Sequence, residues 1–387
     1  MLIQRLPHLS LANKYCRTEM ASDFIVIGAG IIGLSTALRL LEEGASVTLL
    51  DRREAGCEAS WAGGGILSPL YPWNYSDSVT RLAAYSMSRY PEWTAALNTA
   101  TGIDPEYQIC GLVILPPCDP EAAVNWCSAH AVRLTYLSSS HHGGLSWAHI
   151  NDEQGNAQAL FLPEVAQVRN PRLLQALYKR IRQLGGKIIE HCEVQELEIS
   201  GQKVHAIRTP SEKHSADQYI LSAGAWSRKI LGEHALNLAI KPIRGQMLLY
   251  RLPGNPLCSI VLQRDLYLIP RRDGHLLVGS TIEDTGFDKQ ITLDAKNRLS
   301  SWAEEILPQL KNTPLLKHWS GLRPATPDNI PIIGPHPFLE NLYINSGHFR
   351  YGVTMAPGSA EILVNEILKR TQPFDVTPYQ RGWHPSE

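Results

Sequence analysis

The residues Phe24-Ile-Val-Ile-Gly28-Ala-Gly30-Ile-Ile-Gly33 carry the clearest indication of the fold of this chain. The four apolar residues from Phe24 are typical of a buried parallel strand. The GxGxxG spacing predicts a tight turn into a helix over residues 31–43, whose N-terminus points at the pyrophosphate of a dinucleotide. A second apolar strand is predicted over residues 46–50, and Asp51 lies where an acidic side chain bonds ribose hydroxyls. The stretch therefore predicts a nucleotide-binding βαβ unit.

Composition excludes several other classes of protein. The chain has 387 residues, which is enough for two domains, and its 19% charged and 44% apolar residues are typical of a globular protein. A formal net charge of -1 offers no general attraction to nucleic acid or to an anionic membrane, so neither partner is expected. The apolar run from Phe24 reaches Arg39 too soon for a membrane span, which needs about 20 residues.

The seven cysteines are scattered and contain no CxxC pair. They predict free thiols in a reducing compartment, which we take as the cytoplasm, and no metal site. Residues 1–19 lack the apolar core of a secretory signal and carry basic residues without an acid before Glu19. We expect an N-terminal extension there, with an organelle-targeting segment as the alternative, and the first domain starting near Met20.

Further along the chain the pattern changes from helical to extended. Asn170 and Pro171 are typical of the N-cap and first turn of a helix that ends near Gly185. The other predicted elements are strands at 187–194, 219–222, 247–250, 266–270, 275–279 and 342–345, a hairpin over 197–208, a turn at 271–274 and a final helix over 357–370. Three consecutive glycines, Gly63 to Gly65, predict a backbone that passes close to a flat or bulky group.

These elements predict an α/β fold in two parts. The first is a discontinuous Rossmann-like nucleotide-binding domain of residues 20–90, 155–240 and 320–387. The second is an α+β substrate domain, built on an antiparallel sheet, of residues 91–154 and 241–319.

The chain resembles the D-amino-acid oxidase superfamily of flavoproteins, and within it the family of glycine oxidases of thiamine biosynthesis. The resemblance is carried, in order along residues 22–357, by VIGAGIIG, ASWAGGGILSPLYPW, LSAGAWS, KPIRGQM, YLIPRRDGHLLVGST, HWSGLRPATPDNIPIIGPHP and GHFRYGVTMAP. The first motif fits many families, whereas the last two together are far more specific. The order and spread of the segments extend the resemblance to the whole fold.

The resemblance implies non-covalent FAD. Relatives of the sarcosine oxidase type tether the flavin through a cysteine in the segment matching Gly321 to Asp328, and this chain has no cysteine after Cys258. The implied cofactor contacts are Gly28, Gly30, Ile31, Ile32, Gly33, Asp51, Arg52, Ala59, Ser60, Gly64, Gly65, Ile66, Val194, Gly347, His348, Phe349, Arg350, Tyr351, Gly352, Val353 and Thr354.

The resemblance also implies an amino-acid substrate, whose carboxylate suits the planar fork of an arginine. Arg323 matches the family's carboxylate-binding arginine, Arg350 a second substrate-site arginine, and Tyr267 a substrate-site tyrosine, with Ile66 beside them. A surface ion pair is the alternative for each arginine, and a core position is the alternative for Tyr267. For Arg271 and Arg272, in the predicted turn, we expect surface ion pairs.

The implied reaction is oxidative deamination by hydride transfer to the flavin, giving an imine, then glyoxylate and ammonia, with H2O2 formed from O2. No side chain is expected to act as catalytic acid or base, because the cofactor carries the chemistry. The family also implies a homo-oligomer, a tetramer in its relatives. Alternatives are a D-amino-acid dehydrogenase, a sarcosine oxidase, a non-catalytic flavin-binding module and an NAD-dependent dehydrogenase. The preference among glycine, sarcosine and small D-amino acids stays open.

Overall fold

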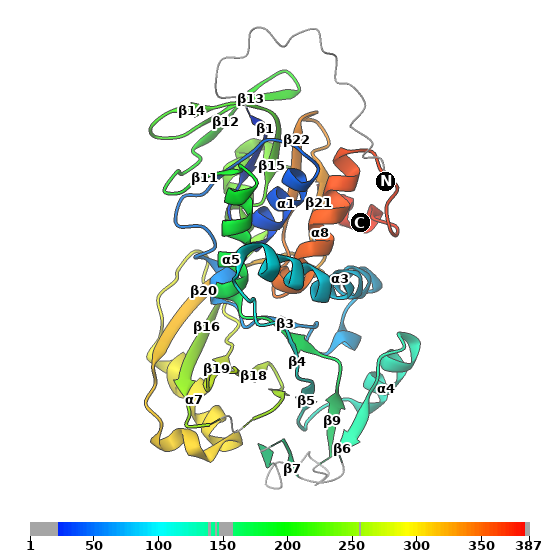
Figure 1. The fold of residues 1–387 in the computed structure, drawn as a ribbon, viewed down its shortest axis with the longest axis vertical. Helices are drawn as coiled ribbons and strands as arrows, with labels where there is room; N and C mark the ends of the chain where they lie inside the picture. Colours follow the sequence, from blue (N-terminus) through cyan, green and yellow to red (C-terminus); the bar gives the residue numbers. More distant parts are fainter. Residues whose placement is uncertain (1–21, 138–140, 144, 147–157, 255–256, 384–387) are drawn as a thin grey trace.

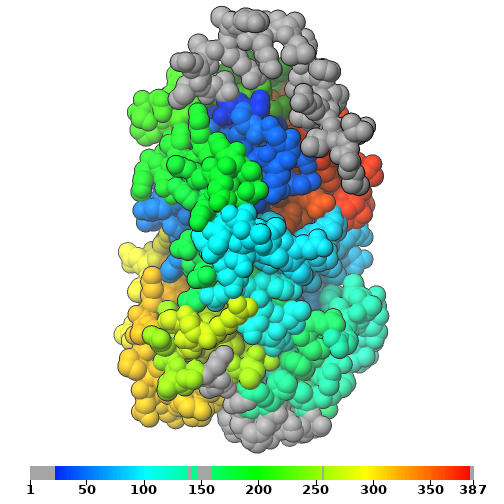
Figure 2. Space-filling view, in the orientation of Figure 1, coloured from blue at the N-terminus to red at the C-terminus, as the bar shows by residue number. Residues whose placement is uncertain are grey.

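The computed structural model describes residues 22–137, 141–143, 145–146, 158–254 and 257–383, so the predicted extension over residues 1–19 lies outside the described residues. The chain forms two large sheets, of six and eight strands, each packed against helices (Figure 1). Figure 2 shows the first and last segments, in blue and red, together in one half of the molecule, with the yellow and orange segment around residues 260–310 in the other half.

The six-stranded sheet has the order β11-β2-β1-β15-β22-β21, and its strands are parallel except for β21, which is antiparallel to β22. Its strands are β1 (Ser22–Ile27), β2 (Val47–Leu50), β11 (Lys187–Ile189), β15 (Ala216–Leu221), β21 (Ile332–Pro335) and β22 (Leu342–Ser346). Helix α1 (Ile31–Glu42) joins β1 to β2, which confirms the predicted βαβ unit. β11 is shorter than predicted, because His191 adopts a left-handed φ of 55° and the chain turns away after it.

Both faces of this sheet are buried, which explains its continuous apolar runs. Along β1, Phe24 and Val26 pack against the helices, whereas Ile25 and Ile27 pack against a small three-stranded sheet on the other face. That sheet contains β12 (Glu196–Ser200), β13 (Lys203–Arg208) and β14 (Lys213–His214). The predicted hairpin over residues 197–208 is β12 and β13.

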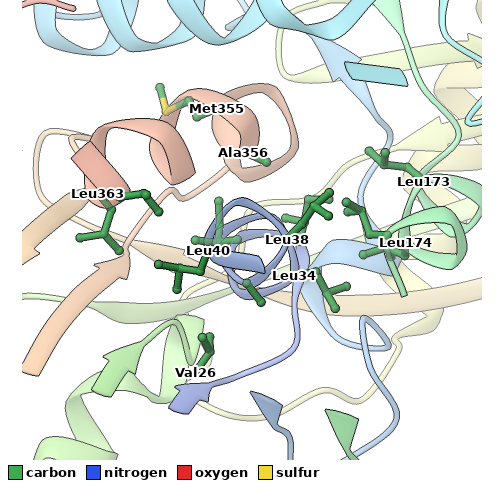
Figure 3. Packing of buried hydrophobic residues seen from close by; sticks show 14 of the residues in the cluster. Val26, Leu34, Leu38, Leu40, Leu173, Leu174, Met355, Ala356 and Leu363 are labelled. Atoms are coloured by element: carbon green, nitrogen blue, oxygen red, sulfur yellow. The ribbon is translucent and has the colours of Figure 1, made fainter. Parts of the chain in front are cut away.

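Helices α1, α5 (Asn170–Gln183) and α8 (Gly352–Ile367) cover the first face, and α3 (Asp77–Thr101) packs on α5 and α8. Figure 3 shows α1 seen nearly end-on, with Leu34 and Leu38 turned toward Leu174 of α5. Met355 of α8 lies on the other side of α1 in the same view. The helices therefore hold α1, and with it the glycine turn before it, in a fixed position against β1.

Helix α8 begins at Gly352, earlier than the predicted start at residue 357. Pro357 lies inside the helix and has no N–H to bond the carbonyl of Val353. The hydroxyl of Tyr90, on α3, donates a hydrogen bond to that carbonyl instead. A contact from a distant helix thus allows the additional first turn, which places the N-terminus of α8 close to the 347–351 loop.

The eight-stranded sheet has the order β20-β16-β19-β18-β17-β5-β9-β6, with one parallel pair, β5 and β17. Its strands are β5 (Leu112–Ile114), β6 (Thr135–Leu137), β9 (Ala159–Leu162), β16 (Lys241–Arg251), β17 (Ile260–Gln263), β18 (Leu266–Pro270), β19 (His275–Gly279) and β20 (Lys317–Ala325). Helix α7 (Leu293–Ile306) packs on one face. β9 and most of β20 fall in ranges assigned above to the nucleotide-binding domain, so the sheet extends beyond the predicted substrate domain, and the partition stays a prediction.

The remaining elements are short: α2 (Ala59–Ala62), β3 (Ile66–Leu67), β4 (Gln108–Ile109), α4 (Pro120–Ala129), β7 (His141–His142), β8 (Leu145–Ser146), β10 (Ala166–Gln167), α6 (Ser227–Leu231), α9 (Thr377–Gln380) and 3₁₀ helices at Pro72–Asn74, Gly224–Trp226, Gly232–Ala235, Pro308–Asn312 and Arg381–Trp383. Among the helices of the described ranges, none has the length and apolar character needed to cross a membrane.

Candidate active site

A cavity of about 680 Å³ extends from the glycine turn after β1 to strands β16, β18 and β20 of the eight-stranded sheet. It begins at the carboxyl ends of the parallel strands, the usual location of ligand sites in such sheets. Every predicted cofactor residue except Gly33 and Thr354 lines this cavity, as do Arg323 and Tyr267. The structure therefore brings together residues separated by more than 300 positions in the sequence.

The glycine turn leaves no room for side chains. Gly28 has a φ of +102°, and a Cβ atom there would lie 2.5 Å from the carbonyl oxygen of Ser222. A Cβ atom on Gly33 would lie 1.9 Å from the carbonyl oxygen of Gly28, so Gly33 shapes the turn from outside the cavity. Gly30, in extended conformation, faces Ser60, whose Oγ accepts a hydrogen bond from the N–H of Ile31. Bare backbone therefore faces the cavity at the N-terminus of α1.

Asp51 connects the end of β2 to this turn. Its Oδ2 accepts from the N–H of Ala29 at 2.7 Å and its Oδ1 from the N–H of Arg53 at 2.9 Å. Burial raises the pKa of the carboxyl group, and the two backbone hydrogen bonds oppose that rise. A carboxylate has about four acceptor positions, so Asp51 keeps acceptors for ribose hydroxyls.

Arg52 lies beside Asp51 and packs on an aromatic ring. Its guanidinium carbon lies 3.7 Å from the ring centroid of Trp226, and its Nη2 donates to Glu58 at 2.6 Å. Glu58 also accepts from Lys289, which comes from the segment after β19. Trp226 belongs to the LSAGAWS motif, most of whose residues line this wall of the cavity. The motif was recognised in the sequence, but its residues were not predicted as cofactor contacts.

The glycines at 63–65 run through a narrow space between the two sheets. A Cβ atom on Gly64 would lie 2.5 Å from Ile269, and one on Gly65, whose φ is +74°, would lie 2.2 Å from the carbonyl oxygen of Val168. The side-chain amide of Asn170 donates to the carbonyl oxygens of Ser60 and Gly63. The prediction of Asn170 as the N-cap of α5 was therefore wrong: it is the first helical residue, and its side chain holds this loop.

The structure contradicts a second expectation, the surface ion pair predicted for Arg271. Arg271 is only 4% exposed, so it forms no surface ion pair. Its guanidinium donates to the carbonyl oxygens of Gly64 and Val168, at 2.6 and 2.9 Å, and to Gln167 at 2.6 Å. Burial lowers the pKa of Arg271 to about 10. Arg272, the next residue, is exposed and pairs with Asp104, as expected.

Sequence reasoning missed Arg271 as the side chain that holds the glycine loop in place. A turn position predicts exposure, and only the fold places this turn against the glycine loop. The arginine side chain is long enough for its N–H groups to reach backbone carbonyl oxygens that have no hydrogen-bond donor nearby in the sequence.

Arg323 lies on β20 and is partly buried. Its Nη1 donates to the carbonyl oxygen of Thr281 at 3.1 Å and its Nη2 to Ser280 Oγ at 2.7 Å. Burial lowers the pKa of Arg323 to about 10, which keeps the guanidinium protonated at neutral pH. Within the described part of the chain no carboxylate forms an ion pair with it, and the nearby Glu283 bonds Arg244 and Gln246. A partly buried cation on a cavity wall without an acidic partner suits an anionic ligand.

Tyr267, on β18, lies next to Arg323. Its hydroxyl donates to Ser280 Oγ at 3.1 Å and lies 3.9 Å from Met247 Sδ. The side chain of Tyr267 is buried, and its ring also lines the cavity. Tyr267 is therefore a core residue and a cavity residue at the same time. Ile66 lines the same region, and its carbonyl oxygen accepts from Thr354 Oγ1 at 3.0 Å.

The loop from Gly347 to Tyr351 forms the last wall and leads into α8. Gly347 and Phe349 have left-handed φ values of 84° and 45°, and the N–H of Phe349 bonds the carbonyl oxygen of Pro324. Burial lowers the pKa of His348 to about 3, and its Nε2 lies 2.9 Å from Ser359 Oγ. Arg350 makes a 3.4 Å ion pair with the exposed Asp265, and its buried Nη2 has no hydrogen-bond partner among the described residues.

Comparison with known proteins agrees with this geometry. A family model described as FAD dependent oxidoreductase matches residues 23–366. The chain belongs to the FAD-dependent oxidoreductase family. Its cofactor is accordingly FAD, as predicted, and the bare glycine turn, the free acceptors of Asp51 and the length of the cavity fit that dinucleotide.

Individual proteins are similar to this chain over most of its length. A glycine oxidase of Pseudomonas aeruginosa is 40% identical over 362 residues, which cover 93% of this chain and 98% of that protein. A bifunctional ThiO/ThiG protein of Trichormus variabilis is 30% identical over 367 residues, and the chain spans 53% of its length. The crystal structure of glycine oxidase from Geobacillus kaustophilus has a TM-score of 0.86 and 24% identity, and the match covers 95% of this chain and 100% of that chain.

Proposed function

We propose that this protein is a glycine oxidase, which oxidises glycine, sarcosine and small D-amino acids with O2 and supplies the imine for the thiazole of thiamine. The observation that carries this proposal is Arg323, a partly buried cation on the cavity wall that no described acid neutralises. Its fork holds the substrate carboxylate, and the ring of Tyr267 borders it, while the single hydroxyl proton of Tyr267 is donated to Ser280.

FAD, which the glycine turn and Asp51 would hold without a covalent bond, would supply the hydride acceptor for the substrate Cα, and O2 would take up the electrons as H2O2. The imine formed in this way would react with water to give glyoxylate and ammonia. The chain's residues bind and orient the substrate: Arg323 binds the carboxylate, and Tyr267, Arg350 and Ile66 border the same end of the cavity. His348 is uncharged at neutral pH and bonded to Ser359, so it acts as no base.

The wall opposite the glycine loop favours small substrates. Tyr267 and Met247 pack against Gly279, where a Cβ atom would lie 3.0 Å from the Tyr267 ring and 3.1 Å from the Met247 side chain. These side chains have no space behind them into which a large substituent could push them. We therefore expect turnover to fall as the side chain on the substrate Cα grows.

A panel of amino acids with peroxide detection tests the proposal. Glycine, sarcosine and D-alanine should be oxidised, and bulky D-amino acids poorly. Faster turnover of D-phenylalanine than of glycine would indicate a general D-amino-acid oxidase. Reduction of an added quinone without peroxide formation would indicate a dehydrogenase.

The other assignments also remain proposals. The cofactor and substrate contacts are those predicted above. The two-domain partition, a cytoplasmic location and a homo-oligomer without nucleic-acid or membrane partners complete the proposed description. Size-exclusion chromatography with light scattering would test the oligomer.

A further inference from the structure

Ser280 is a buried hydroxyl next to Arg323 and Tyr267 but outside the cavity lining. It follows β19 and is 0% exposed. Its Oγ lies 2.7 Å from Arg323 Nη2 and 3.1 Å from the Tyr267 hydroxyl, and both of these groups donate to it. A hydroxyl oxygen has two lone pairs, so these two donors use its full acceptor capacity. One atom thus connects two side chains of the proposed substrate site.

The guanidinium of Arg323 is also constrained by the backbone of a neighbouring strand. β16 and β20 pair with Ile243 opposite Arg323, so Gly245 is the diagonal neighbour on the same face. A Cβ atom on Gly245 would lie 2.1 Å from both Nη atoms of Arg323. The guanidinium therefore lies directly on the backbone of β16, where only glycine leaves room for it.

The hydrogen bonds of Arg323 set which donors remain for a ligand. A guanidinium has five N–H donors, and Thr281 O and Ser280 Oγ each take one, on different nitrogens. With Gly245 against both Nη atoms and these two acceptors bound, the group has little freedom to rotate. The remaining donors are left for a ligand, and the Tyr267 hydroxyl is held beside the guanidinium by the same Ser280 oxygen.

We propose that Ser280 is a positioning residue that fixes Arg323 and Tyr267 relative to each other and so pre-forms the site for the substrate carboxylate. This rests on the proposed function for the identity of the substrate, but only on the structure for the binding of a carboxylate. Ser280 itself touches no substrate, because it is buried behind both side chains. Ser280 acts by holding the side chains of Arg323 and Tyr267 in place, because side chains that are already immobile lose less conformational freedom when a ligand binds.

The test is the variant Ser280→Ala, studied as the FAD-loaded protein. Acetate is the probe, because it presents a carboxylate but cannot be oxidised, and its binding is followed by the change in the flavin absorption spectrum. We expect acetate to bind about 5- to 30-fold more weakly, as for loss of a buried acceptor worth roughly 1–2 kcal/mol. The KM for glycine should rise by a similar factor, with kcat changed by about twofold at most.

Ser320→Ala is the matched control. Ser320 lies on β20, and its hydroxyl donates to the carbonyl oxygen of Lys289, away from Arg323 and Tyr267. This variant loses one hydroxyl from the same sheet, and its acetate affinity and glycine KM should equal those of the unaltered protein. In the Arg323→Lys background, Ser280→Ala should have a smaller effect than alone, because the fork it positions is gone.

Three outcomes would overturn the inference: unchanged acetate affinity in Ser280→Ala, an equal loss in Ser320→Ala, or a lower kcat and FAD content with an unchanged KM, which would show a structural role only. Failure of the proposed function looks different. If the unaltered protein binds acetate in a Ser280-dependent way but does not oxidise glycine, the positioning role holds and the substrate assignment is wrong.

Discussion

Replacing Arg323 by alanine is the most direct test of the candidate site. The change removes the partly buried cation together with its hydrogen bonds to Thr281 O and Ser280 Oγ. It should leave FAD binding intact, because the cofactor contacts at Gly28 and Asp51 lie at the other end of the cavity. We therefore expect a yellow protein that binds its substrate weakly.

The magnitude follows from burial. Removing one partner of a desolvated, hydrogen-bonded charge pair costs roughly 2–5 kcal/mol, much of it from leaving the carboxylate unpaired. At tenfold per 1.4 kcal/mol, this corresponds to roughly 30- to 4000-fold weaker apparent affinity for glycine. Arg323→Lys should recover only part of the loss, because an ammonium group cannot reproduce the planar fork that lies on Gly245.

The assay is steady-state kinetics with peroxide detection, on protein whose flavin content has been measured from its absorption spectrum. A raised KM, with or without a lower kcat, in a fully yellow enzyme supports the carboxylate role. Arg133→Ala is the control, since Arg133 is exposed and pairs only with Glu164 among the ion pairs described for it. Unchanged glycine kinetics in Arg323→Ala would refute the assignment and transfer the role to Arg350 or another group.

Three further predictions concern the cofactor, the glycine loop and pH. Gly30→Val should give a flavin-poor protein of lower thermal stability, because a branched side chain would occupy the approach of the pyrophosphate, and full flavin occupancy would contradict the assignment. Arg271→Met should lower the melting temperature and FAD retention, since each buried carbonyl left unpaired costs about 1–3 kcal/mol, whereas Arg272→Met should do neither. Acetate binding should be constant around neutral pH and weaken as the pH rises through about 10, because the Arg323 guanidinium loses its proton there and binds the carboxylate only when protonated; weakening near neutral pH would implicate another group.

Much of the fold could be predicted because its signals are local. The glycine spacing, the apolar run before it and the acid after the second strand act within one βαβ unit, and the structure places that unit as expected. The hairpin of β18 and β19 was also predictable, since both strands and the turn at 271–274 carry their own patterns. β17, which pairs with β18, was not predicted. The start of α8 was not, because its first turn depends on a hydroxyl of Tyr90 supplied by another helix.

The candidate site divides in the same way. The nucleotide-binding turn and the FAD-dependent family could be recognised from the amino-acid sequence, and Arg323 and Tyr267 could be proposed as site residues, because these features depend on residue types in fixed motifs. The folded structure was needed to show that Arg271 is buried against the glycine loop, that Asn170 holds that loop, and that Ser280 joins Arg323 to Tyr267. What a long or polar side chain does depends on the group to which it hydrogen-bonds. Here each of those groups lies on another strand or loop, which comes within hydrogen-bonding distance only when the sheets are packed.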